Sequence, residues 1–137
     1  MMHPLIQRLY DEYGYPEVTL ETHPGFVNQP GITVLFFAGD PKRFRETTDV
    51  AVVLPELVKA FEGALQPGVV AADAELTLQQ HYGFTAWPAL VFLRDGGYLG
   101  CITGIQNWSD YLRDIEALMT AEVRQPGKRL DVPVISA

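Results

Sequence analysis

The stretch at residues 82–97, YGFTAWPALVFLRDGG, constrains the fold more than any other part of the chain. Residues 89–93 are apolar without interruption, which predicts a strand covered on both faces. Pro88 has no N–H to donate to a ladder, so we expect the strand to begin directly after it. Residues 95–97, Asp-Gly-Gly, tolerate positive φ and predict a hairpin turn into a second strand.

The rest of the chain alternates apolar segments that predict helices and strands around this hairpin. We expect helices at residues 5–13, 49–61, 73–82 and 107–119, strands at residues 18–20, 32–37, 69–72, 89–93 and 98–103, and connections at residues 22–31 and 39–48. Asp49 is expected to cap the second helix, and Asn107 or Ser109 the last one. Pro55 removes a backbone hydrogen bond inside the second helix and should bend it. This order demands an α/β fold, with a mixed sheet and helices on both faces.

Length, charge and cysteine content narrow the class of protein. The 137 residues suit one domain, which we place at residues 1–124, followed by a flexible tail at residues 125–137 that lacks a hydrophobic period. A net charge of −7 argues against nucleic-acid binding. No apolar run approaches a membrane span, and residues 1–15 do not resemble a signal peptide. With Cys101 as the single cysteine, we expect a cytoplasmic protein without an intramolecular disulfide.

The residue types that usually carry catalysis are not arranged for it. His3, His23 and His81 are scattered without metal-ligand spacing, and the sequence has no phosphate-binding glycine loop or serine-nucleophile motif. We expect His81 to interact with a helix dipole and His23 to be exposed in a loop. We therefore predict no catalytic residue, no metal and no cofactor.

Two features resemble the thioredoxins. An apolar strand entered through X-Pro and preceded by Tyr-Gly-Phe resembles the second half of thioredoxin, and Pro55 resembles the proline inside the thioredoxin helix. The resemblance implies a cis peptide bond at Pro88. It also implies a thioredoxin-like fold, with a mixed central sheet of about four to five strands flanked by helices on both faces.

The same resemblance shows which chemistry is missing. The spacing of the family places the redox Cys-x-x-Cys at Thr47-Thr48-Asp49-Val50, and the buried aspartate of thioredoxins falls on Leu35. Dithiol exchange needs a thiolate and a resolving thiol, so a thioredoxin reaction is excluded. Cys101 lies in the return strand, where a lone cysteine usually acts as a small buried hydrophobe. The alternative is a single-cysteine thioredoxin-like oxidoreductase, which requires Cys101 to be exposed with a lowered pKa.

The chain resembles most closely the HyaE/HupG family of hydrogenase expression proteins, which are thioredoxin-like and lack the redox cysteines. The resemblance covers roughly residues 5–121 and rests on Pro30-Gly31, on VLFFAGDP at residues 34–41, on the helix start without cysteine and on residues 82–100. It implies a non-catalytic maturation chaperone for an uptake [NiFe] hydrogenase. Such a protein is expected to bind the twin-arginine signal peptide of the small-subunit precursor before export, and possible further partners are other hydrogenase maturation proteins.

The resemblance also implies candidate binding residues. In thioredoxins an extended peptide pairs with the backbone of the residue before the cis-proline, which is Trp87 here, beside Pro88. Either Trp87 offers a large flat surface to the peptide, or it packs against the long loop and closes the groove. The candidate acceptors for arginine are Asp40, Glu46, Asp49 and Asp73. The remaining alternative is a structural interaction domain of a larger assembly, without a peptide groove.

Overall fold

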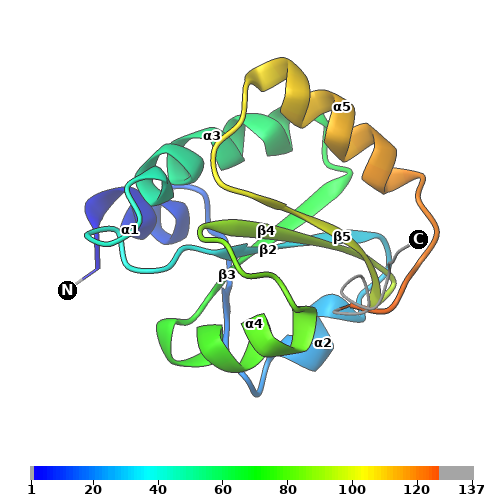
Figure 1. Cartoon of the computed structure of the whole chain (residues 1–137), viewed down its shortest axis with the longest axis horizontal. Coiled ribbons are helices and arrows are strands. Elements are labelled where there is room, and N and C mark those ends of the chain that lie inside the picture. Colours follow the sequence, from blue (N-terminus) through cyan, green and yellow to red (C-terminus); the bar gives the residue numbers. More distant parts are fainter. Residues whose placement is uncertain (1, 127–137) are drawn as a thin grey trace.

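The computed structural model describes residues 2–126, in which a five-stranded mixed sheet is covered by helices on both faces (Figure 1). The elements are α1 (Pro4–Asp11), β1 (Glu17–Val18), α2 (His23–Val27), β2 (Ile32–Phe37), α3 (Glu46–Ala60), β3 (Leu65–Val70), the 3-10 turn η1 (Ala72–Ala74), α4 (Glu75–Tyr82), β4 (Ala89–Arg94), β5 (Gly97–Thr103) and α5 (Trp108–Met119). The expected α/β architecture is confirmed.

The sheet has the strand order β1-β3-β2-β4-β5, with β2 and β4 near its centre. β3 runs parallel to both β1 and β2, whereas β4 is antiparallel to β2 and to β5. Asp95 and Gly96 have φ values of 51° and 87°, which confirms the predicted hairpin turn between β4 and β5. All six residues of β2 are buried, as its continuous apolar sequence predicts.

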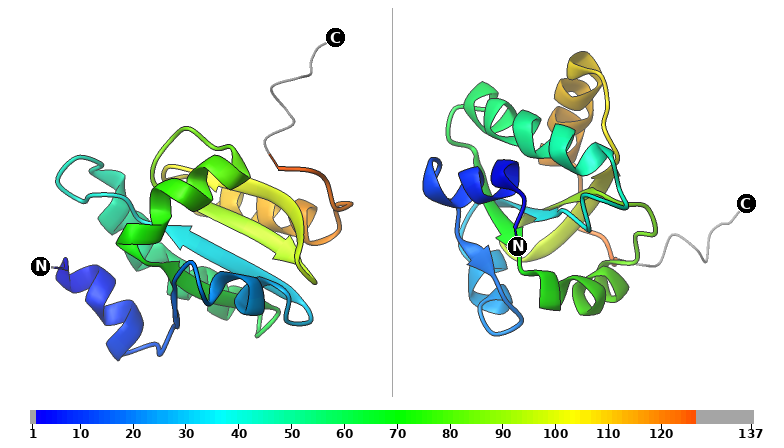
Figure 2. Two further views of the ribbon diagram at one scale, coloured as in Figure 1. Left: turned by 90° about the horizontal axis from the view of Figure 1, so that it is seen from below. Right: turned by 90° about the vertical axis from the view of Figure 1, so that its left-hand side faces the viewer.

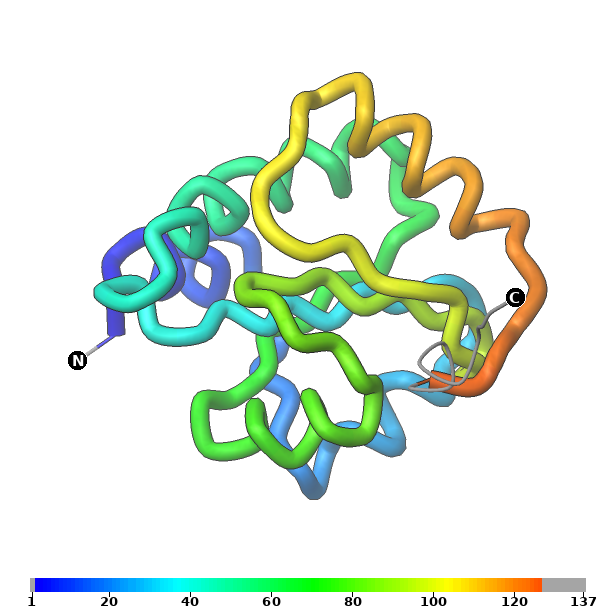
Figure 3. The backbone as a smooth tube through the Cα atoms, viewed as in Figure 1, coloured from blue at the N-terminus to red at the C-terminus, as the bar shows by residue number. Residues whose placement is uncertain are grey.

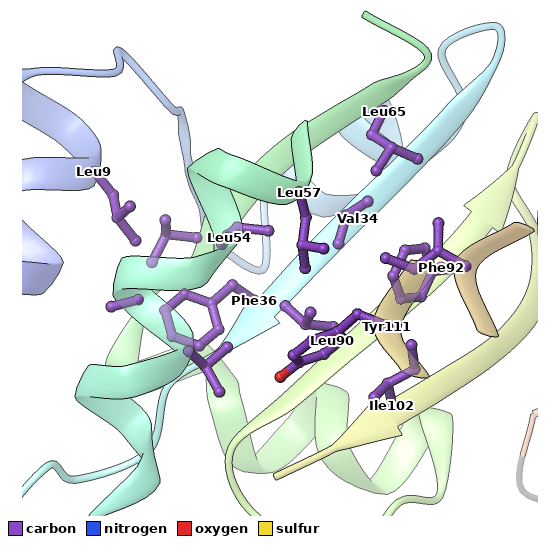
Figure 4. Packing of buried hydrophobic residues seen from close by; sticks show 14 of the residues in the cluster. Leu9, Val34, Phe36, Leu54, Leu57, Leu65, Leu90, Phe92, Ile102 and Tyr111 are labelled. Carbon is purple, nitrogen blue, oxygen red and sulfur yellow. The ribbon is translucent and has the colours of Figure 1, made fainter. Parts of the chain in front are cut away.

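Helices lie on both sides of the sheet (Figure 2), and two hydrophobic clusters hold them against it. Successive side chains of a strand point to opposite faces, so β2 supplies Val34 and Phe36 to one cluster and Leu35 and Phe37 to the other. The first cluster joins the sheet to α1, α3 and α5 (Figure 4). The second joins it to α2 and α4.

The helix α3 begins earlier than predicted, and the predicted cap at Asp49 is wrong. Its first residue is Glu46, and the preceding Arg45 makes no capping hydrogen bond through its side chain. Tertiary contacts fix this start instead, because the Thr47 hydroxyl donates a hydrogen bond to the Ala38 carbonyl at the end of β2. The predicted internal proline, Pro55, is confirmed within this helix.

Residues 23–27, predicted as part of a connection, form the short helix α2 instead. Its first residue, His23, is half-buried and hydrogen-bonded to the Tyr82 hydroxyl at 2.6 Å, so the expectation of an exposed loop histidine is wrong. The helix is also favoured by the turn before it, where Thr19 and Thr22 exchange side-chain-to-backbone hydrogen bonds. The sequence contains no local pattern that predicts the contact between His23 and Tyr82.

The strands at one edge also differ from the prediction. β3 begins at Leu65, four residues before the predicted start, and includes Pro67 and Gly68. A proline is tolerated there because the two-residue β1 pairs only with Val69 and Val70, which leaves β3 as an edge at Pro67. Among residues 2–126, no helix is long and apolar enough to cross a membrane.

Near the C-terminus, Asn107 occupies the N-cap position of α5, but its side chain makes no capping hydrogen bond. The predicted position of the cap is therefore confirmed, and the predicted mechanism is wrong. The flexible tail predicted at residues 125–137 falls mostly outside the described residues and stays a prediction.

Candidate functional site

The loop that precedes β4 contains a cis peptide bond between Trp87 and Pro88, as expected. Ala89 pairs with Phe37, so this loop lies at the same end of the sheet as the end of β2 and the start of α3. The ring of Pro88 is buried, and its carbonyl accepts a hydrogen bond from the Gly104 N–H at 2.8 Å. Pro88 therefore shapes the loop and presents little surface of its own.

The Trp87 indole packs against the loop between β2 and α3, as in the second arrangement considered for it. Its ring stacks on Phe44 at a centroid distance of 6.0 Å and meets the edges of Phe84 and Phe37 at 5.2 and 6.2 Å. Gly39 has a φ of 72°, and a Cβ there would lie 2.8 Å from Phe44 and 3.2 Å from Trp87. The close packing therefore requires glycine at this position, and Trp87 remains half-buried.

The side chain of Trp87 is packed against its neighbours, but its main chain has no hydrogen-bond partner among residues 2–126. Its backbone N–H and carbonyl form no hydrogen bond with any other residue of the described chain. The two residues before it, Thr85 and Ala86, are exposed. A peptide in extended conformation can pair with a backbone segment of this kind.

The positions of the missing thiols carry inert side chains. Thr47 is fully buried with its hydroxyl bonded to Ala38, and Val50 is 1 % exposed. Leu35, at the position of the thioredoxin aspartate, is also fully buried. Cys101 is partly exposed and pairs with Val91 in the β4–β5 ladder. Within residues 2–126, no group of three or more His, Cys, Asp or Glu side chains is arranged to hold a metal ion.

The predicted carboxylates all follow the ends of β2 and β3, and they are exposed. Asp40 accepts a hydrogen bond from the Lys42 N–H at 3.0 Å, Asp49 lies in the first turn of α3, and Asp73 lies in η1. Glu46 is engaged elsewhere, because its Oε1 accepts the Ile105 N–H at 2.6 Å and so ties α3 to the loop after β5. Glu46 is thus a poorer acceptor for a partner than the other three.

A cavity of about 450 Å³ lies between α1 and the ends of β2 and β3, and we call it the α1 cavity. It is lined by Met2, His3, Ile6, Tyr10, Glu17, residues 38–41, Val69, Val70, Ala72 and Glu75. Figure 3 shows α1 and the chain between β2 and α3 at the same end of the molecule, and residues of both line the cavity. Of the predicted carboxylates, only Asp40 lies in its wall.

Glu75 is the most enclosed carboxylate of this cavity. Its Oε2 accepts the Gly39 N–H at 3.0 Å. Burial raises the pKa of Glu75 above its ordinary value, and backbone hydrogen bonds from Gly39 and Ala38 partly oppose the rise. Our sequence reasoning missed Glu75, although its place two residues after Asp73 puts it at the same end of the sheet. Glu17 lies on an edge strand of only two residues, and no pattern in the sequence predicts that it lines the same cavity.

The sheet order, the cis-proline before β4 and the proline inside α3 define a thioredoxin-like protein, and Thr47 and Val50 mark it as one without redox thiols. The sequence comparisons agree with this class and narrow it. Residues 5–111 match the family described as Hydrogenase-1 expression protein HyaE, and the chain belongs to that family.

Individual relatives support the same family assignment. The hydrogenase expression/formation protein HoxO of Azotobacter vinelandii is 49% identical over 122 residues, covering 89% of this chain and 82% of the relative. HupG of Rhodobacter capsulatus is 38% identical, covering 88% of each chain. A crystal structure of the hydrogenase expression/formation protein HupG from Rhodopseudomonas palustris superimposes with a TM-score of 0.55 at 39% identity, covering 86% of this chain and 99% of that one.

Proposed function

We propose that this protein is a non-catalytic maturation chaperone for an uptake [NiFe] hydrogenase. It acts in the cytoplasm, where it binds the twin-arginine signal peptide of the small-subunit precursor before export. Membership of the HyaE family supports the assignment to hydrogenase maturation. The relatives that cover most of this chain are named hydrogenase expression/formation proteins.

The observation that carries the peptide-binding part is the unpaired main chain of Trp87 beside the start of β4. An extended peptide that pairs with this segment gains backbone hydrogen bonds without requiring a particular sequence. The partly exposed aromatic surface of Trp87 and Phe44 suits the apolar segment of a signal peptide. Selection then depends on side chains nearby.

Charge supplies that selection. Asp40, Asp49 and Asp73 are exposed at this end of the sheet, and none of them forms an ion pair with another described residue. Two adjacent arginines are a strong match for such carboxylates, because a guanidinium donates several hydrogen bonds to them. A non-catalytic role fits the loss of both redox thiols and the burial of Thr47.

Co-purification from cells that produce the hydrogenase tests this proposal. An affinity-tagged form of the protein should recover the small-subunit precursor, and it should not recover the mature subunit that lacks the signal peptide. Replacing Arg-Arg of the signal peptide with Gln-Gln should abolish recovery. Equal recovery of the Arg-Arg and Gln-Gln precursors, or of the mature subunit, would contradict the proposal.

A further inference from the structure

The α1 cavity has an acidic lining. Its lining includes the carboxylates of Glu17, Asp40 and Glu75, and no lysine or arginine is among the described residues of its wall. None of the three forms an ion pair within the described chain. Asp40 belongs to the loop between β2 and α3, which also carries Lys42 and two arginines, so Glu17 and Glu75 are the carboxylates that distinguish the cavity.

The two other titratable side chains of the cavity are His3 and Tyr10. The Nδ1 atom of His3 accepts a hydrogen bond from the Leu5 N–H at 3.1 Å, which caps the start of α1. Burial, followed by the charges of Glu17 and Glu75, raises the pKa of Tyr10 to about 12. The phenol therefore stays neutral, and it lies within electrostatic range of both glutamates.

We propose that the α1 cavity binds the side chain of one of the two arginines of the signal peptide, with Glu75 and Glu17 as the groups that receive its guanidinium. This inference rests on the proposed function, and it adds to the exposed aspartates a second site for arginine that the thioredoxin resemblance does not supply. A volume of about 450 Å³ is within the range of small-ligand pockets, roughly 300–1,000 Å³.

The walls suit an arginine along its whole length. Ile6, Val69 and Val70 offer apolar surface to the aliphatic part of the side chain. The two carboxylates come from different elements, Glu17 from β1 and Glu75 from the start of α4. A guanidinium in the cavity can therefore approach both of them. A planar guanidinium with five N–H donors can serve two carboxylates at once, whereas a lysine ammonium is a single point charge.

The cavity is within reach of a peptide that pairs at Trp87. The cavity lies at the end of β3, and the loop with Trp87 lies at the start of β4. Both β3 and β4 are neighbours of β2, one on each side. Two strand spacings amount to about 10 Å, which an extended chain spans in about three residues. Gly39 lies between the sites, since its N–H donates to Glu75 and its α-carbon faces Phe44 and Trp87.

Fluorescence anisotropy with a labelled twin-arginine signal peptide of a hydrogenase small subunit tests the inference on the full-length protein. Glu75→Gln and Glu17→Gln should each weaken binding by about tenfold, because each removes a charge that faces the guanidinium. Glu116→Gln, an equal change of charge on the exposed face of α5, should leave the Kd unchanged. Substituting one of the two arginines in the peptide should largely remove the effect of Glu75→Gln, because both changes break the same contact.

A second pair of variants does not depend on the half-buried Glu75. Ala72 is exposed and lines the cavity, so Ala72→Arg supplies a competing guanidinium from the protein itself. We expect this variant to weaken binding by at least about tenfold, as expected for loss of a desolvated charge pair. Ala117→Arg, on the exposed face of α5, adds the same charge away from the cavity and should bind as the unsubstituted protein does.

The outcomes separate the two proposals. If the unsubstituted protein binds the Arg-Arg and Gln-Gln peptides equally, the proposed function fails. If it prefers the Arg-Arg peptide but the Kd is unchanged in both glutamate variants, or unchanged in Ala72→Arg, the function stands and the role of the α1 cavity is overturned. Should Glu75→Gln fail to fold by circular dichroism, the exposed sites Glu17 and Ala72 decide the question.

Discussion

At the scale of single residues, Glu75 combines burial with charge. Because burial raises its pKa in the folded protein, the native state holds the proton to a higher pH than the unfolded chain does. Ionisation therefore lowers native stability as the pH rises from the ordinary value of 4.5 through the folded pKa. A charged group kept at such a cost is more typical of a binding site than of a structural one.

We predict that Glu75→Gln raises the melting temperature at neutral pH. The amide oxygen of glutamine can still accept the Gly39 N–H, while the cost of burying a charge disappears. The gain should vanish below the ordinary glutamate pKa of 4.5, where the native carboxyl is protonated. Thermal unfolding at about pH 7 and about pH 4 measures the difference, and a loss of stability at both would show that the carboxylate is needed for folding.

Cys101 offers a second residue-scale test. It is partly exposed, lies in a strand and packs against the cluster that contains Leu35 and Phe37. We expect slow labelling by a thiol reagent in the folded protein and fast labelling in denaturant, because a strand-bound thiol is poorly accessible. Labelling of the folded protein as fast as that of the unfolded chain would instead favour the single-cysteine oxidoreductase.

At the scale of secondary-structure elements, side chains from distant segments fix the helix ends. The Arg94 guanidinium, at the end of β4, donates to the carbonyls of Met119 and Ala121 at 3.1 and 2.7 Å. Met119 is the last residue of α5 and Ala121 lies two residues beyond it, and carbonyls at a helix end have few partners within the helix. The contact therefore joins the end of α5 to the central sheet.

We predict that Arg94→Met lowers the free energy of unfolding by about 1–2 kcal/mol, since water replaces only part of two charge-assisted hydrogen bonds. Urea unfolding measures this value. Arg113→Met is the matched control, because Arg113 is exposed on α5 and forms only surface ion pairs, worth about 0–1 kcal/mol. Equal effects of the two substitutions would mean that the contact from β4 does not stabilise α5.

The elements that the sequence predicted best are those whose signal is local. β2 coincides with the predicted residues 32–37 because its apolar run is continuous, and the turn at Asp95 is fixed by its own chemistry. The misplaced elements depend on long-range contacts: α2 on the bond between His23 and Tyr82, and the start of α3 on Thr47. The α1 cavity was missed for the same reason, since its walls come from α1, β1, β3 and α4.

At the scale of the whole molecule, the acidic character and the thioredoxin-like frame act together. In the proposed function, the net charge of −7 attracts a basic peptide, and the backbone at Trp87 and the α1 cavity determine where that peptide binds. Loss of the redox groups leaves the shape of the frame intact, because Thr47 and Val50 fill the positions of the thiols and Leu35 fills that of the aspartate, all as buried side chains. Binding without turnover is the function that this combination supports.

The most direct test is the affinity of the purified protein for the twin-arginine signal peptide and for its Gln-Gln variant, measured by calorimetry at low and high salt. We predict that the Arg-Arg peptide binds at least about tenfold more tightly at low salt, and that the difference shrinks as salt rises. Equal affinities for the two peptides at both salt concentrations would contradict the account.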